Sequence, residues 1–145
     1  MKYLYTIIVS LVLVLYLTSC GNQLSKAEQE FDATMQNVID AHDEVMPKMG
    51  NINSLIQQLE SKIDTTTTGQ AHQKVQKDLK DAYDFMMNWM EDFSEKFPYE
   101  EKDKKFTPEE LAKKLRVLKE EEIEVQEMRD QINTSILKAE NLLKS

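Results

Sequence analysis

Residues 42–49 read His42-Asp43-Glu44-Val45-Met46-Pro47-Lys48-Met49 and stand in the middle of a long heptad pattern. On both sides the seam positions recur alternately four and three residues apart, which is the spacing of a coiled-coil helix. The seam comprises Leu24, Glu28, Phe31, Met35, Val38, His42, Val45, Met49, Ile52, Ile56, Leu59 and Ile63. Pro47 removes one backbone hydrogen bond but leaves the heptad phase intact, so we expect one helix over residues 26–63, kinked near Pro47. A complete break into two helices is the alternative.

A turn and a second helix follow. Residues 64–69 combine β-branched polar residues with a glycine, which disfavours helix, and Thr67 with Gln70 forms a capping-box pattern. The second seam comprises His72, Val75, Leu79, Ala82, Met86, Trp89 and Phe93. Because the residue before a proline avoids helical geometry, the second helix should cover residues 69–96 and end before Pro98.

The third helix has the clearest start in the chain. Thr107 can act as N-cap, Pro108 suits the first helical position, and Glu110 can complete a capping box. We expect a helix over residues 108–143 with a seam of Leu111, Leu115, Leu118, Glu122, Val125, Arg129, Ile132, Ile136, Ala139 and Leu143. The two charged seam positions should meet partners on other helices, Arg129 with Glu60 or Asp78.

These three helices predict an all-α fold. Short connections favour antiparallel neighbours, so residues 26–145 should form an elongated up-down-up three-helix bundle with coiled-coil-like packing. An open hairpin that completes its core by dimerising is the alternative, which leaves both a monomer and a homodimer open.

The N-terminal segment has a different character. Met1-Lys2-Tyr3 is followed by an apolar run of about 14 residues, short of the roughly 20 that a membrane-spanning helix needs. The run ends in Leu17-Thr18-Ser19-Cys20, which resembles a bacterial lipobox. We therefore expect residues 1–19 to be a lipoprotein signal peptide, Cys20 to carry the lipid, and residues 20–25 to form a lipidated tether. Cys20 is the one cysteine, so disulfide chemistry and thiol catalysis are excluded.

Charge excludes one class of partner. The formal net charge is -8, and nucleic-acid binding depends on Lys and Arg that neutralise phosphates. The sequence predicts an anchor in the bacterial outer membrane with the polypeptide in water, on the periplasmic or the external face.

One constellation could bind metal. If the first turn is centred near residues 66 and 67, facing residues of the first two helices have numbers that sum to about 133. This places His42 near Glu91, and it gathers five soft ligands at one level: His42, Met46, Met49, Met86 and Met90. They could bind Cu(I), or a histidine and a methionine could ligate haem. In the structural interpretation the methionines fill the core beside Trp89 and His42 pairs with Glu91. His42 and His72 should lie too far apart to share zinc.

The HDEVMPKM stretch and the later Met86-Met87-Asn88-Trp89-Met90 resemble a family of small lipoproteins of Bacteroidota-type bacteria, often labelled "viral A-type inclusion protein". The resemblance covers the lipobox and the first two helices. It implies an exported helical lipoprotein and carries no activity or site residue.

No glycine-rich phosphate loop or Ser-His-Asp arrangement is present in the sequence. We therefore expect no enzymatic activity and no cofactor, and a lipid-anchored helical envelope protein that acts through contacts with another envelope protein. An extracytoplasmic Cu(I)-binding protein is the alternative.

Overall fold

The computed structural model describes residues 24–102 and 104–144, and over these the chain is helical apart from short connections and contains no strand. The elements are α2 (Lys26–Val45), the 3-10 turn η1 (Met46–Lys48), α3 (Met49–Glu60), α4 (Thr67–Lys96), the 3-10 turn η2 (Tyr99–Glu101) and α5 (Pro108–Lys144). The predicted signal peptide, Cys20 and the predicted tether up to residue 23 fall outside the described residues.

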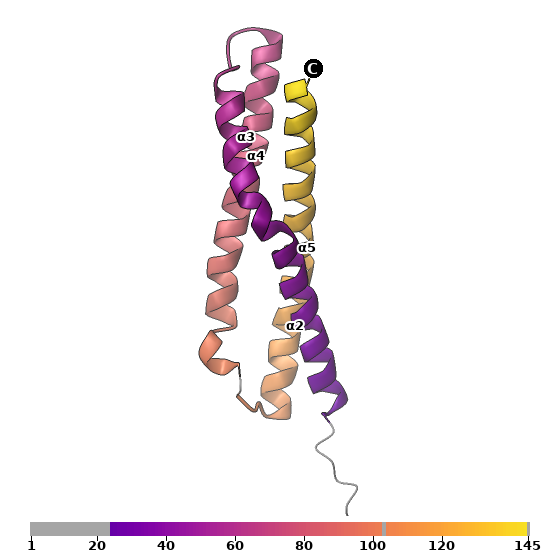
Figure 1. Ribbon diagram of the computed structural model, residues 1–145. Coiled ribbons are helices and arrows are strands. Elements are labelled where there is room, and N and C mark those ends of the chain that lie inside the picture. The colour runs from indigo at the N-terminus through magenta and orange to yellow at the C-terminus, as the bar shows by residue number, and fades with distance from the viewer. Residues whose placement is uncertain (1–23, 103, 145) are drawn as a thin grey trace, which may run out of the picture.

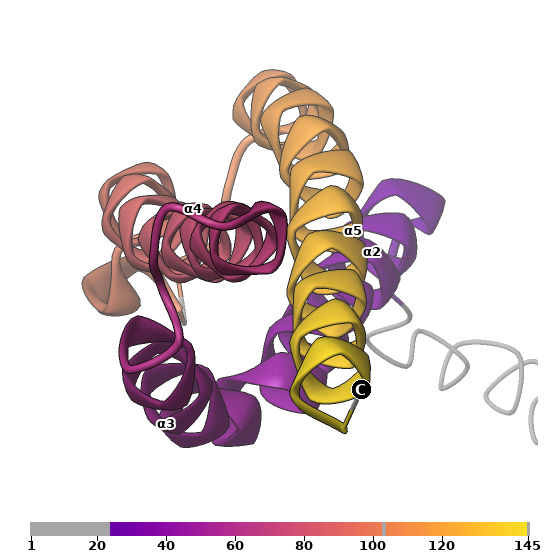
Figure 2. The same cartoon turned by 90° about the horizontal axis from the view of Figure 1, so that it is seen from above.

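The helices pack as an elongated up-down-up bundle, as the sequence predicts (Figure 1). In the upper half α3 runs beside α4, whereas in the lower half α2 packs on α5. Seen from above, α5 stands between α4 and α2 (Figure 2). The first two helical segments therefore use different partners.

Pro47 is the point at which this change of partner occurs. The expected single helix over residues 26–63 is divided here, because three residues adopt 3-10 geometry with Pro47 near the start of η1. Met46 N–H still bonds His42 O and Met49 N–H bonds Met46 O, so the chain bends without losing helical conformation. Proline lacks the amide hydrogen of a continuous α-helix, which explains the tighter turn.

The residues that cap the helices agree in part with the predicted caps. Thr107 N–H donates to Glu110 Oε2 (2.8 Å) and Glu110 N–H donates to Thr107 Oγ1 (3.3 Å), as expected for the third helix. The second helix is capped by Thr66, one residue before the predicted Thr67. A reciprocal capping box between Ser25 and Glu28, which was not among the predicted caps, begins α2.

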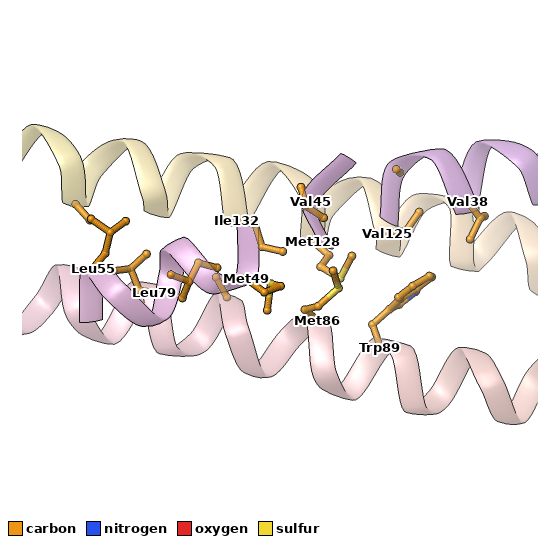
Figure 3. Packing of buried hydrophobic residues seen from close by; sticks show 14 of the residues in the cluster. Val38, Val45, Met49, Leu55, Leu79, Met86, Trp89, Val125, Met128 and Ile132 are labelled. Atoms are coloured by element: carbon orange, nitrogen blue, oxygen red, sulfur yellow. The ribbon is translucent and has the colours of Figure 1, made fainter. Parts of the chain in front are cut away.

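The core follows each predicted seam only in part. Along α2 and α3, Thr34, Ala41 and Leu55 are buried in place of Met35, His42 and Ile56, and on α4 Gln76 is buried in place of Val75. Val38, Val45, Met49, Leu79, Met86 and Trp89 lie in the buried cluster with Val125 and Ile132 of α5 (Figure 3). On α5, however, Glu121, Met128 and Ser135 are buried in place of the predicted Glu122, Arg129 and Ile136.

Arg129 also lacks the partners predicted for it. Its guanidinium lies 2.8 Å from Asp130 and 3.8 Å from Glu44, and it contacts neither Glu60 nor Asp78. The prediction was wrong because the buried seam of α5 is displaced by one residue, which moves Arg129 to the edge of the interface with α2.

Candidate functional site

A row of aromatic rings runs along the lower half of α4. The Trp89 and Phe93 rings are stacked with centroids 4.9 Å apart, and Phe93 and Phe97 follow at 5.1 Å. The ring centroid of Phe31 of α2 lies 6.3 Å from those of both Phe97, directly after α4, and Phe106, two residues before α5. Phe31 therefore connects α2 with both of these rings. These large side chains fill the space between α2 and α4, whose backbones diverge below Pro47 (Figure 1).

Beside this row lies a hollow of about 520 Å³, here called the α2–α4 groove. Its apolar lining comprises Phe31, Met35, Ile39, Phe93, Phe97, Pro98, Tyr99 and Phe106. Most of these residues are half-buried, and Tyr99 is 81% exposed. Since monomeric proteins rarely leave a continuous apolar surface open to water, the groove is a candidate contact site.

The lower end of the groove is held by Lys114. Its ammonium group lies 5.2 Å from the Phe97 ring centroid and 5.4 Å from that of Phe106, and it forms an ion pair with Glu101. Hydrogen bonds from Lys114 and Lys104 hold the pKa of Glu101 below its usual value. These contacts fasten the connection between α4 and α5 and fix the aromatic floor.

Apolar side chains continue up α2, on the side turned away from α5. Residues nine positions apart lie two and a half turns apart and so on opposite sides of a helix. Met35 lies nine residues before Glu44, which binds Asn133 of α5. Ile39 lies nine residues after Glu30, which binds Lys119, and Met46 lies nine residues after Asn37, which binds Glu122. All three apolar side chains are therefore on the side of α2 turned away from α5.

The same spacing applies to α4. Met87 lies nine residues from Asp78 and from Lys96, both of which contact side chains of α5. Met87 is 47% exposed, Met46 44% and Ile39 37%. We call the surface formed by Met35, Ile39, Met46, Met87, Met90 and Phe97 the open face.

His42 is half-buried and lies between the open face and the core. Its ring centroid lies 5.8 Å from that of Trp89, which confirms that the two motifs share one level of the rod. Nδ1 of His42 lies 2.9 Å from Asp43 Oδ1, within hydrogen-bond distance. The expected pairing with Glu91 was wrong, because an acid one residue away is within reach.

The five predicted metal ligands occupy different environments. Met86 is fully buried and Met49 is 8% exposed, and both belong to the core with Met128 (Figure 3). Met90 is partly buried, whereas Met46 is exposed. Among the described residues no group of three or more His, Cys, Asp or Glu side chains could hold a metal ion.

Acidic residues flank the open face. Asp32 and Asp43 of α2 and Asp84 and Glu91 of α4 are exposed, and within the described residues their carboxylates form no ion pair with Lys or Arg. Other acids are neutralised: Glu44 by Lys48, Asp81 by Lys77 and Glu101 by two lysines. The open face therefore has acids at its margin, although exposed acids without a Lys or Arg partner among the described residues, such as Glu95 and Glu120, also lie elsewhere on the rod.

Sequence reasoning missed the groove, although two signals for it were present. Ile39 follows the seam residue Val38 and Met87 follows Met86, so each seam has an apolar neighbour on one flank. Such flanking residues indicate a helix that packs against two neighbours. Here the second neighbour is missing from the chain over its described residues.

No helix of the described residues has the length and apolar character that crossing a membrane requires. A family model described as "EMYY-motif containing lipoprotein" matches residues 1–145. No curated protein and no solved structure matches the chain. The tetrapeptide Glu-Met-Tyr-Tyr does not occur in this sequence, so the family description points to no particular residue here.

Proposed function

Because the chain belongs to the EMYY-motif containing lipoprotein family, a family of the cell envelope, we propose that it is a non-enzymatic adaptor which binds another envelope protein through its open face. The observation that carries this proposal is the exposed apolar surface on diverging α2 and α4. Ile39, Met46 and Met87 are each more than a third exposed on that surface. Protein contacts are the usual reason for such a patch on a water-exposed domain.

The membrane attachment of the family fits this role. We propose that a lipid on Cys20 anchors the chain in the outer membrane, with the tetrapeptide Leu17-Thr18-Ser19-Cys20 as support. Leu24 begins the described residues at the same end of the rod as the groove (Figure 1). A partner bound in the groove would therefore be held close to the membrane.

A photoreactive residue tests the contact in cells. With the full chain carrying a benzophenone side chain at Met87, we expect irradiation to attach one envelope protein. The matched control carries the same group at Ile123, a 63% exposed residue of α5. If position 87 gives no adduct, or the same adducts as position 123, the open face is not a protein contact.

The rival function, a Cu(I) carrier, has less support. Cu(I) binding needs thioethers that converge on one point. Met86 lies in the core, whereas Met46 is nine residues from Asn37 and faces away from α5. We therefore favour the structural interpretation of the methionines.

A further inference from the structure

The kink at Pro47 leaves a position for one more helix. Above it, α3 runs beside α4; below it, α2 crosses onto α5 and diverges from α4 (Figures 1 and 2). Met87, on the flank of α4 turned away from α5, is 47% exposed, so no helix of the described residues covers it there. The open face thus has helical walls on two sides and lies away from α5. A helix placed there would turn the lower half into a four-helix arrangement.

The methionine and phenylalanine side chains of the open face and the α2–α4 groove suit a bound helix of variable sequence. Methionine side chains are unbranched and polarisable, and they adapt to different apolar partners. Phe93 and Phe97, four residues apart, give the floor a spacing that matches apolar anchors on a bound helix.

The charges specify which helix fits. Asp32 lines the groove, whose lower end also has Lys102 and Lys114, and Asp84 and Glu91 lie three and four residues from Met87 on α4. Asp32, Asp84 and Glu91 form no ion pair with Lys or Arg among the described side chains, and Asp43 pairs there with His42 alone. A partner with Lys or Arg on both edges of its apolar stripe would neutralise them. A second copy of this chain would bring acid against acid, because the net charge is -8, and anionic lipid would be repelled in the same way.

We propose that the open face and the α2–α4 groove receive a basic amphipathic helix of a partner protein. This inference rests on the proposed function and adds the chemical class of the partner. The apolar stripe of the helix would lie on Met35, Ile39 and Met87. Its basic residues would face the acidic borders on α2 and α4.

A defined peptide tests this with the chain from Gly21 to Ser145, which retains every contact of the described bundle. The probe is a helix of about 18 residues, roughly 27 Å long, with leucines on one face and lysines on the other. The comparison peptide has glutamate in place of every lysine. Trp89, the one tryptophan of the chain, lies beside His42 and reports binding by fluorescence.

We expect the lysine peptide to bind at least about tenfold more tightly than the glutamate peptide. Met87→Lys should weaken binding of the lysine peptide at least tenfold, whereas Ile123→Lys on α5 should leave it within about twofold. Both substitutions replace an exposed apolar residue, so circular dichroism should show folded protein in each case. Asp84→Asn with Glu91→Gln should weaken binding and reduce its dependence on salt.

Three results would overturn the inference: no binding of the lysine peptide, equal affinity for both peptides, or equal loss in Met87→Lys and Ile123→Lys. The photocrosslinking experiment at position 87 distinguishes failure of the basic-helix inference from failure of the proposed function. If mass spectrometry maps that adduct to an acidic or non-helical segment, the partner contact stands and the basic helix is wrong. If no adduct forms, the proposed function itself fails.

Discussion

The carboxylate of Glu44 on α2 accepts a hydrogen bond of 3.0 Å from the side-chain amide of Asn133 on α5. Lys48 closes a triangle, since its ammonium donates to Asn133 Oδ1 at 2.7 Å and to Glu44 Oε1 at 3.3 Å. Glu44 and Lys48 lie on either side of Pro47. Asn133 therefore fastens both sides of the bend to α5 and keeps α2 away from α4.

Asn133→Ala should lower the free energy of unfolding by about 1 kcal/mol relative to a matched variant, because two hydrogen bonds at a half-buried position are lost. The control is Asn141→Ala, an exposed asparagine of the same helix, which gains the same helix propensity. Urea denaturation followed by circular dichroism measures the difference. Equal stability of the two variants would show that the triangle does not hold the bend.

Lys96→Met should destabilise the bundle by about 2 kcal/mol or more. Glu121 is 2% exposed, and its Oε1 accepts from Lys96 Nζ at 2.8 Å while Oε2 has no partner among the described atoms. Removal of Lys96 would leave a buried carboxylate without compensation.

The double variant Lys96→Met/Glu121→Met should recover most of that loss, because an apolar pair often replaces a buried ion pair without cost. Thermal melts of the single and double variants test this, with Lys113→Met as a surface control. A double variant as unstable as Lys96→Met would contradict it.

Stability should fall in acid. Hydrogen bonds to the backbone and side chain of Thr107 lower the pKa of Glu110, and bonds to Ser25 do the same for the pKa of Glu28. A lowered folded-state pKa gives stability that is fully present above the unfolded value and is lost as pH falls through the folded value. The thermal midpoint should therefore be level from neutral pH down to about 5 and fall below that.

Glu110→Gln should reduce the acid slope, because glutamine can still accept from Thr107 N–H but does not titrate. Glu109→Gln, one residue earlier and without a bond to Thr107, is the control. Thermal midpoints measured from neutral to acid pH compare the two. A slope for Glu110→Gln that equals that of the unchanged chain would show that this cap does not contribute.

Much of the fold could be predicted because heptad spacing reports directly on the buried face of a helix. His72, Leu79, Met86 and Trp89 are buried as their spacing indicates, and the Thr107 cap identifies the start of α5. These signals act within one helix and need no knowledge of its neighbours.

The seam of α5 was misplaced for the opposite reason. Because α5 contacts α2 on one side and α4 on the other, apolar residues occur on two flanks and two registers fit the sequence. In the register that the structure has, the buried Glu121 pairs with Lys96, and that contact comes from a residue 25 positions away.

The flanking apolar residues could have indicated an open surface, but the width of the groove could not be predicted, because counting from a turn gives the level of two residues along a rod and not the distance between their helices. The level was correct, as the contact between His42 and Trp89 shows. The separation depends on the direction of the bend at Pro47, which Asn133 of α5 fixes.

Replacement of Cys20 tests the anchor. Cys20→Ser removes the thiol that would carry the lipid, so we expect the protein to move from the membrane fraction to the soluble fraction. Several acyl chains are needed for firm attachment, and none would remain. Ser19→Ala, which keeps a small residue before the cysteine, should leave the protein in membranes; a Cys20→Ser protein that still sediments with membranes would contradict the assignment.

Cu(I) should bind the chain from Gly21 to Ser145 no more tightly than about micromolar, measured anaerobically against a competing chelator. Met86 and Met49 would have to leave the core to meet Met46 on the open face, and exposing buried methionines costs about 1.5–3 kcal/mol for each side chain. His42, the one nitrogen ligand of the set, already contacts Asp43 and Trp89. Binding that is tighter than micromolar and is lost in His42→Ala, but kept in His72→Ala, would overturn this expectation and restore the metal site.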